Sequence, residues 1–197
     1  MLYGRPSWPT LGSHNDPNLN EICMKRATHL MLGAAVAMPI AVPLSPGLAL
    51  GAIWWGMVGG GFPDWFDLRS DLRKPLRLRH RGASHGLPFG LLMTAGVWFV
   101  LRLLSQTPLD LGSITIQVPA DALRPWALAF GLGFLSHILG DACTHAGIRP
   151  FLPLSDWRFW LTPKFLRGKS NGPLDFIVRF IATTIILAGL IAYAFLR

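Results

Sequence analysis

The feature that most constrains this chain is a series of long segments without a charged side chain. Residues 27–63, 86–101 and 180–196 contain no Asp, Glu, Lys or Arg. A helix needs about 20 mostly apolar residues to cross a bilayer. Only 14% of the residues are charged and 51% are hydrophobic, which is too apolar for an ordinary soluble domain. The sequence therefore predicts a multi-pass membrane protein.

The apolar segments predict an all-α fold, a multi-pass transmembrane helical bundle. The first two helices should form a hairpin around Pro46, and both are shorter than the ~20 residues of a full span, so the hairpin should be thin or tilted. The expected helices cover residues 28–44, 48–62, 87–104, 125–141 and 175–196.

The sequence also predicts how the chain is divided outside and inside the helical bundle. Residues 27–197 should form one membrane-embedded domain, and the proline-rich and asparagine-rich residues 1–26 should form a mobile N-terminal arm. Residues 109–119 should contain a short strand outside the bundle, because Ile114 and Ile116 alternate with polar neighbours.

The basic residues lie mainly on one side of this arrangement. Fourteen Lys and Arg residues fall in the arm and in the loops 63–86 and 142–174, against three on the opposite side. This asymmetry predicts an inner-membrane protein whose long basic loops face the cytoplasm. Membrane orientation and contact with bilayer lipid explain the net charge of +8, so no specific nucleic-acid binding is expected.

Histidine and aspartate residues gather at the predicted cytoplasmic ends of the helices, although they are far apart in the chain. The segments predicted on the opposite side contain no histidine and only Asp110 and Asp121. A helical bundle would bring the gathered residues to one end, where ionisable groups are costly unless they have a function. These residues are His29, Asp64, Asp67, His80, His85, His137, Asp141, His145 and Asp175.

Three pairs have the chemistry of metal ligands. Asp64 and Asp67 should leave the second helix where glycines and Pro63 end it, although a cap and an arginine partner would also explain them. His80 and His85 flank a glycine turn and offer two imidazoles, a ligand type that suits zinc. His137 and Asp141 lie four residues apart on one face of a helix. This spacing suits either a pair of metal ligands or a structural hydrogen bond between the two side chains.

The order and spacing of these motifs resemble the YdjM-like family, described as LexA-binding, inner-membrane-associated hydrolases or membrane-bound metal-dependent hydrolases. The resemblance runs from about residue 28 to about residue 179 and leaves the arm before Met24 outside. It is carried by His29 and by residues 62–67, 80–85, 136–141 and 144–147.

That family is distantly similar to zinc-dependent phospholipase C and P1-type nucleases, which cut phosphoesters with clustered zinc ions. The resemblance implies one to three divalent cations, with zinc favoured and manganese or iron as alternatives. Family members often carry Glu where this chain has Asp175, which could ligate the metal, orient a ligand or do neither. The implied ligands are His29, Asp64, His80, His85, His137 and Asp141.

The favoured hypothesis is a metal-dependent hydrolase that acts on a phosphoester or phospholipid-like substrate, which could reach the site from the bilayer. Asp67 or Asp175 is expected to act as general base or to orient a histidine. Arg79 and Arg81 lie beside the predicted ligands in sequence and are expected to hold phosphate, although the positive-inside bias would also put arginines there.

Two other functions fit parts of the pattern. A membrane metal carrier or transporter would also use His and Asp, but it predicts ionisable residues deep in several helices. A non-enzymatic membrane adaptor would use the basic residues 69–81 to bind anionic lipid, nucleic acid or a regulator and would not need the histidine pairs.

Overall fold

The structure is a computed structural model that describes residues 24–68, 83–169 and 171–196. Most of the predicted N-terminal arm, 1–26, lies outside the described residues. Apart from one small two-stranded hairpin, the regular secondary structure of the described chain is helical, which confirms the all-α prediction. Its long helices are α2 (Arg26–Ala41), α3 (Pro46–Leu68), α5 (Leu87–Gln106), α6 (Leu123–Ala142) and α7 (Pro173–Phe195).

Short elements fill the connections between the helices. The strand expected in residues 109–119 is a two-stranded antiparallel hairpin, β1 (Leu109–Asp110) with β2 (Thr115–Ile116). The single-turn 3-10 helices are η2 (Ala83–His85), η3 (Ala120–Ala122) and η4 (Lys164–Leu166).

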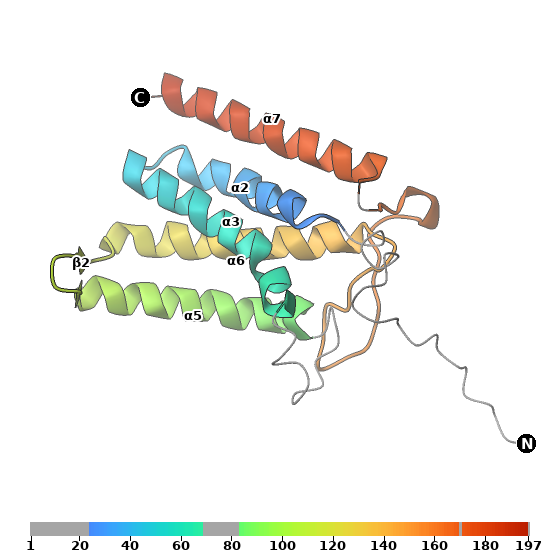
Figure 1. The fold of residues 1–197 in the computed structure, drawn as a ribbon, viewed down its shortest axis with the longest axis horizontal. Coiled ribbons are helices and arrows are strands. Elements are labelled where there is room, and N and C mark those ends of the chain that lie inside the picture. The colour runs from blue at the N-terminus through green and yellow to red at the C-terminus, as the bar shows by residue number, and fades with distance from the viewer. Residues whose placement is uncertain (1–23, 69–82, 170, 197) are drawn as a thin grey trace, which may run out of the picture.

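The bundle has an inner group and two outer helices. Helices α2, α3 and α6 pack against one another, α7 lies on α2, and α5 lies on α6 (Figure 1). Three described helices are long and apolar enough to cross a membrane, namely Leu87–Gln106, Ala120–Ala142 and Pro173–Phe195. Helix α2 has 16 residues, which is shorter than the ~20 residues of a full span. Helix α3 has 23 residues, so the prediction that both members of the hairpin are shorter than a full span is confirmed for α2 and wrong for α3.

Glycines allow the three inner helices to touch backbone to backbone. A Cβ atom added to Gly133 of α6 would lie 2.1 Å from the carbonyl oxygen of Gly56 of α3. A Cβ atom added to Gly56 would lie 2.5 Å from the carbonyl oxygen of Gly33 of α2. Gly56 and Gly60 are four residues apart, which is the small-residue spacing that brings membrane helices into close contact. These contacts hold both α2 and α6 directly against the backbone of α3.

One sequence-based helix boundary was wrong. The second helix was expected to end at residue 62 and turn through Pro63, but α3 continues through Pro63 to Leu68. Proline removes only one backbone donor, and the preceding Gly59 and Gly60 lie against the backbones of α6 and α2. Packing against α2 and α6 therefore stabilises the helical conformation at these glycines and at Pro63. As a result, Asp64 lies on a helix and not in a turn.

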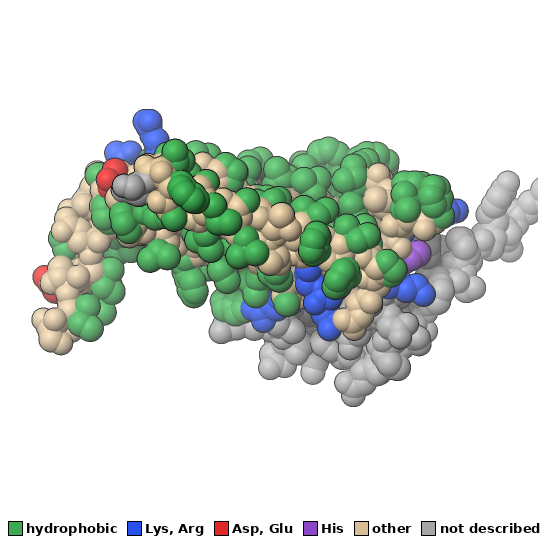
Figure 2. Space-filling model, turned by 90° about the horizontal axis from the view of Figure 1, so that it is seen from above, with side chains coloured by type: hydrophobic (Ala, Val, Ile, Leu, Met, Phe, Trp, Pro, Cys, Tyr) green, Lys and Arg blue, Asp and Glu red, His purple; other side chains and the backbone are tan. Residues whose placement is uncertain are grey.

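The helices alternate in direction, so one end of the bundle collects widely separated parts of the chain. It contains the first turns of α2, α5 and α7 and the last turns of α3 and α6 (Figure 1). Figure 2 shows hydrophobic side chains along the length of the molecule and basic side chains toward the end where a histidine is visible, with a smaller basic group at the opposite end. This arrangement agrees with the predicted grouping of the loops.

Candidate metal centre

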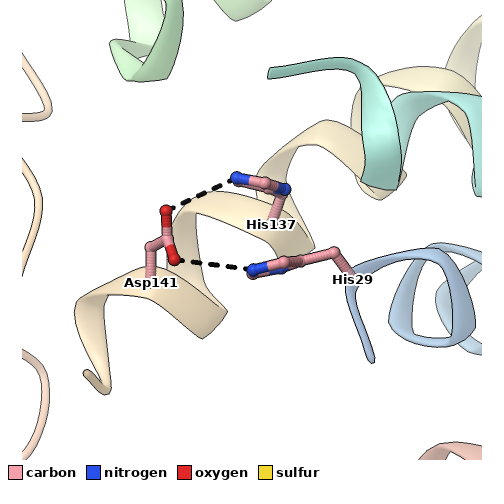
Figure 3. Close-up of side chains that lie close together, drawn as sticks. All are labelled: His29, His137 and Asp141. Carbon is pink, nitrogen blue, oxygen red and sulfur yellow. Dashed lines mark ion pairs between the residues drawn. The ribbon is translucent and has the colours of Figure 1, made fainter. Parts of the chain in front are cut away.

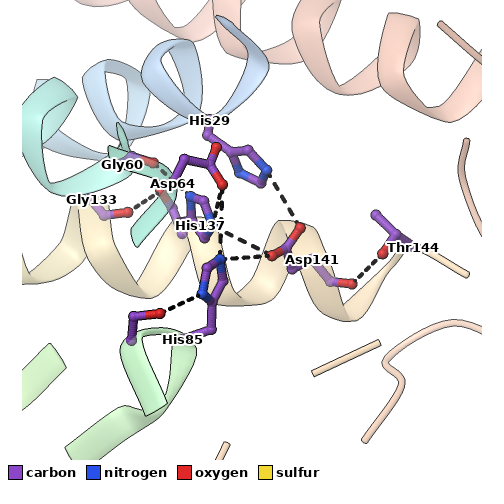
Figure 4. Close-up of polar contacts among 10 residues, drawn as sticks. His29, Gly60, Asp64, His85, Gly133, His137, Asp141 and Thr144 are labelled. Atoms are coloured by element: carbon purple, nitrogen blue, oxygen red, sulfur yellow. Dashed lines mark hydrogen bonds and ion pairs between the residues drawn. The ribbon is translucent and has the colours of Figure 1, made fainter. Parts of the chain in front are cut away.

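Five of the predicted metal ligands meet at this end of the bundle, from four different elements. His29 comes from α2, Asp64 from α3, His85 from η2, and His137 and Asp141 from α6 (Figure 4). Four of them are fully buried, and the Asp64 side chain retains 27% of its exposure. The alternating helices therefore bring residues 29 to 141 of the chain into one cluster.

His137 has a fixed orientation because one ring nitrogen is hydrogen bonded. Its Nδ1 lies 2.7 Å from the carbonyl oxygen of Gly60. A carbonyl can only accept, so Nδ1 carries a proton, and in the neutral ring Nε2 has the lone pair that a metal ligand needs. Nε2 lies 3.4 Å from Asp141 Oδ2 and 3.7 Å from Asp64 Oδ1, and it has no hydrogen-bond partner among the described residues. A metal-binding histidine is held in the same way by a backbone carbonyl.

His85 approaches the same two carboxylates from another side. Its Nε2 lies 3.8 Å from Asp64 Oδ1 and 3.7 Å from Asp141 Oδ2. Its Nδ1 lies 3.2 Å from the hydroxyl of Ser84. His85 and His137 thus present Nε2 atoms to the same carboxylate oxygens.

His29 faces the opposite oxygen of Asp141. Its Nε2 lies 3.5 Å from Asp141 Oδ1, and its ring stacks on that of His137 with centroids 3.8 Å apart (Figure 3). Gly140 leaves room for this ring, since a Cβ atom there would lie 3.3 Å from Cε1 of His29. Asp141 therefore directs one oxygen to His29 and the other to His137 and His85.

These separations fit cation binding. Cation bonds of about 2.0–2.2 Å in tetrahedral geometry place neighbouring ligand atoms about 3.3–3.6 Å apart. Two groups each have their ligand atoms within 4.8 Å of one another, His29 with His137 and Asp141, and Asp64 with His85 and His137. The buried, unpartnered Nε2 of His137 belongs to both groups. The donor set of imidazoles and carboxylates suits zinc and related divalent cations.

Comparison with known proteins supports the resemblance seen in the motifs. The model of the family described as YdjM inner membrane protein matches residues 24–196. The chain belongs to the YdjM family. All five clustered residues lie within the matched region. No curated protein and no solved structure matches the chain.

Asp175 lies in a separate network beside the cluster. It is buried in the first turn of α7. Its Oδ1 accepts a hydrogen bond from the hydroxyl of Thr28 at 2.6 Å, and its Oδ2 accepts one from Arg179 at 2.9 Å. Neither ligand group includes it. Because Thr28 directly precedes His29, the network joins the start of α7 to the turn that carries a candidate ligand.

Several predicted site residues cannot be placed. His80, Arg79 and Arg81 lie outside the described residues, and so does the side chain of Asp67. Their roles remain predictions.

Two other residues at this end of the bundle stand apart from the cluster. His145 is exposed in the loop after α6, and its backbone carbonyl accepts a hydrogen bond from Trp160. Burial raises the pKa of the Cys143 thiol, so without a bound metal the thiol is protonated at neutral pH.

Two contributors to the site were not predicted from the sequence. Thr28 lies in the first turn of α2, whose N-cap is Lys25, and its hydroxyl donates a hydrogen bond to Asp175. The carbonyl of Gly60 was not expected to orient His137, because a backbone acceptor leaves no mark on residue identity. The glycine run 59–61 was the available signal, since it indicates close approach of another chain segment.

Proposed function

We propose that this YdjM family member is a membrane-embedded, metal-dependent hydrolase that acts on a phosphoester, with a phospholipid-like amphiphile as the preferred substrate class. The observation that carries the proposal is the convergence of three imidazoles and two carboxylates at the end of an apolar bundle. Burial of so many ionisable groups is costly unless a cation compensates for it. A bound divalent cation would lower the pKa of its water from far above neutral toward about 7, which would supply hydroxide at neutral pH.

The protein's own residues would divide the work in this proposal. The cation would be held by His29, Asp64, His85, His137 and Asp141. Asp64 is the most exposed of the five, so it marks the side from which substrate approaches. Of the two candidate bases, Asp175 is assigned an orienting role because both of its oxygens are engaged. The general base would then be Asp67, and Arg79 and Arg81 would hold phosphate.

A role as a metal carrier or transporter fits the chain less well than a role as a hydrolase. Residues 30–63 and 86–101 contain no Asp, Glu, Lys, Arg or His, whereas an ion pathway needs polar groups along its depth. In the last helix, Arg179 is paired with Asp175 near the start of α7. A purely adaptor role would not require the buried histidines.

The proposal is tested by hydrolysis assays on the purified full-length protein. We expect zinc-loaded protein to cleave a chromogenic phosphodiester or a fluorescent phospholipid, and a chelator to remove the activity. Asp141→Asn should lower the rate by at least about 100-fold, because it removes the negative charge that faces three imidazoles. The matched control is Asp121→Asn, since Asp121 is exposed in η3 at the opposite end of the bundle. Stoichiometric metal with no activity on any phosphoester would refute the hydrolase assignment and favour the carrier.

The orienting role of Asp175 gives a separate prediction. Thr28→Val keeps the side-chain shape but removes the hydroxyl that donates to Asp175, so the turn that carries His29 should loosen. We expect metal affinity to fall by about 10- to 100-fold, the usual effect of losing a hydrogen bond behind a ligand. Competition with a chelating dye measures this affinity.

Two variants sharpen that experiment. Thr28→Ser restores the hydroxyl and should recover most of the affinity. Thr184→Val should have no effect, because Thr184 is exposed and donates only within its own helix. Equal affinities for wild type and Thr28→Val would show that Asp175 does not act on the metal centre through Thr28.

A further inference from the structure

The loop that joins α6 to α7, residues 143–172, exposes large apolar side chains at the same end of the molecule as the metal centre. Leu154 and Phe165 are each 83% exposed, and Trp157 is 55% exposed. Exposed apolar side chains concentrated in this way typically mark a surface that binds protein or membrane.

The loop is held across the helix ends by backbone hydrogen bonds. Leu87 at the start of α5 donates to the carbonyl of Pro150 at 2.8 Å, and Leu161 donates to Ala142 at the end of α6 at 2.9 Å. Both helices that the loop connects are candidate membrane spans. The loop therefore begins, ends and is fastened at the level where apolar helix gives way to polar surface.

The charge of the loop favours one kind of partner. Residues 143–172 contain five basic residues and a single acidic one, Asp156, which is paired with Arg149 at 3.4 Å. The guanidinium groups of Arg158 and Arg167 lie 6.0 and 4.6 Å from the centre of the Trp160 ring. Tryptophan and phenylalanine interleaved with Lys and Arg are the side chains that favour the headgroup layer of an anionic bilayer.

We propose that residues 143–172 form an interfacial loop that lies in the headgroup layer of the adjacent leaflet and binds anionic phospholipid. Leu154, Trp157 and Phe165 enter the layer, while Arg158 and Lys164 contact phosphate. The inference goes beyond the proposed hydrolase function and depends on neither metal nor catalysis. Its consequence is that lipid headgroups are concentrated beside the metal centre.

A fluorophore placed on the loop tests its depth. Leu154→Cys, made in a chain that also carries Cys23→Ser and Cys143→Ser, is labelled and reconstituted in vesicles of phosphatidylcholine and phosphatidylglycerol. We expect nitroxide lipids labelled near the headgroup to quench the fluorophore at least about twofold more than those labelled deep in the chain. Aqueous iodide should quench it several-fold less than it quenches the free glutathione adduct of the dye. Strong quenching by iodide, or no quenching by any nitroxide lipid, would overturn the proposal.

Charge reversal tests the lipid preference without a probe on the loop. The double variant Arg158→Glu, Lys164→Glu should lower the preference for spin-labelled phosphatidylglycerol over phosphatidylcholine by about fivefold or more. The matched control, Arg102→Glu with Arg124→Glu, reverses two charges at the opposite end and should change it less than twofold. An unchanged preference in the loop variant, or an equal loss in both variants, would count against the loop as the binding surface.

Discussion

Replacing His137 by alanine is expected to reduce the metal content of the purified protein to background. His137 belongs to both ligand groups, and its Nε2 faces Asp64 and Asp141 at 3.7 and 3.4 Å. Its loss breaks both groups at once, so affinity should fall by at least about 100-fold, more than the loss of a supporting hydrogen bond alone. Elemental analysis of detergent-purified protein, with zinc titration of the metal-free form, measures the effect.

The control for this experiment is His145→Ala. His145 lies on the same side of the bundle, but it is exposed and none of the described ligand groups includes it. We expect this variant to retain its metal. If His137→Ala binds zinc as the wild type does, the cluster is not a metal centre and the proposed hydrolase function falls with it.

The second large effect is expected from Gly133→Ala, a change of one methyl group. The new Cβ atom would lie 2.1 Å from the carbonyl oxygen of Gly56. Because the obstacle is backbone, α3 and α6 must move apart, and we expect a loss of about 3 kcal/mol or more in the free energy of unfolding. Thermal unfolding in detergent, followed by the loss of helical circular dichroism, measures the change.

The same substitution at Gly96 provides the comparison. Gly96 lies in α5 with open space where a Cβ atom would be. Because alanine favours the helix, Gly96→Ala should leave stability within about 1 kcal/mol of the wild type or raise it. Similar unfolding temperatures for Gly133→Ala and Gly96→Ala would mean that the inner helices do not rely on backbone contact.

The course of the chain was largely predictable because the bilayer constrains helices by length and charge. The helix expected over residues 87–104 is Leu87–Gln106, and the one expected over 125–141 is Leu123–Ala142. The end of α3 was missed because glycine and proline indicate a helix end only when no neighbouring helix supports them. Long-range packing, which local sequence does not encode, decided the outcome.

The candidate site, like the fold, was predictable only in part. Its ionisable side chains were predicted because such residues are rare in a chain this apolar and stand out in the sequence. The contact between Thr28 and Asp175 spans 147 positions, and the acceptor of His137 is a backbone atom. Neither can be read from residue type or spacing, because each exists only once α7 and α3 have packed on α2 and α6.

The order of the ligands along the chain has a consequence for biosynthesis. Both described three-residue groups include His137 of α6, and to these groups α2 and α3 contribute His29 and Asp64. During translation, neither described group is complete while α6 has yet to emerge. Full coordination by these residues therefore requires α6 to have joined the hairpin, so a complete metal centre would indicate that the bundle has assembled.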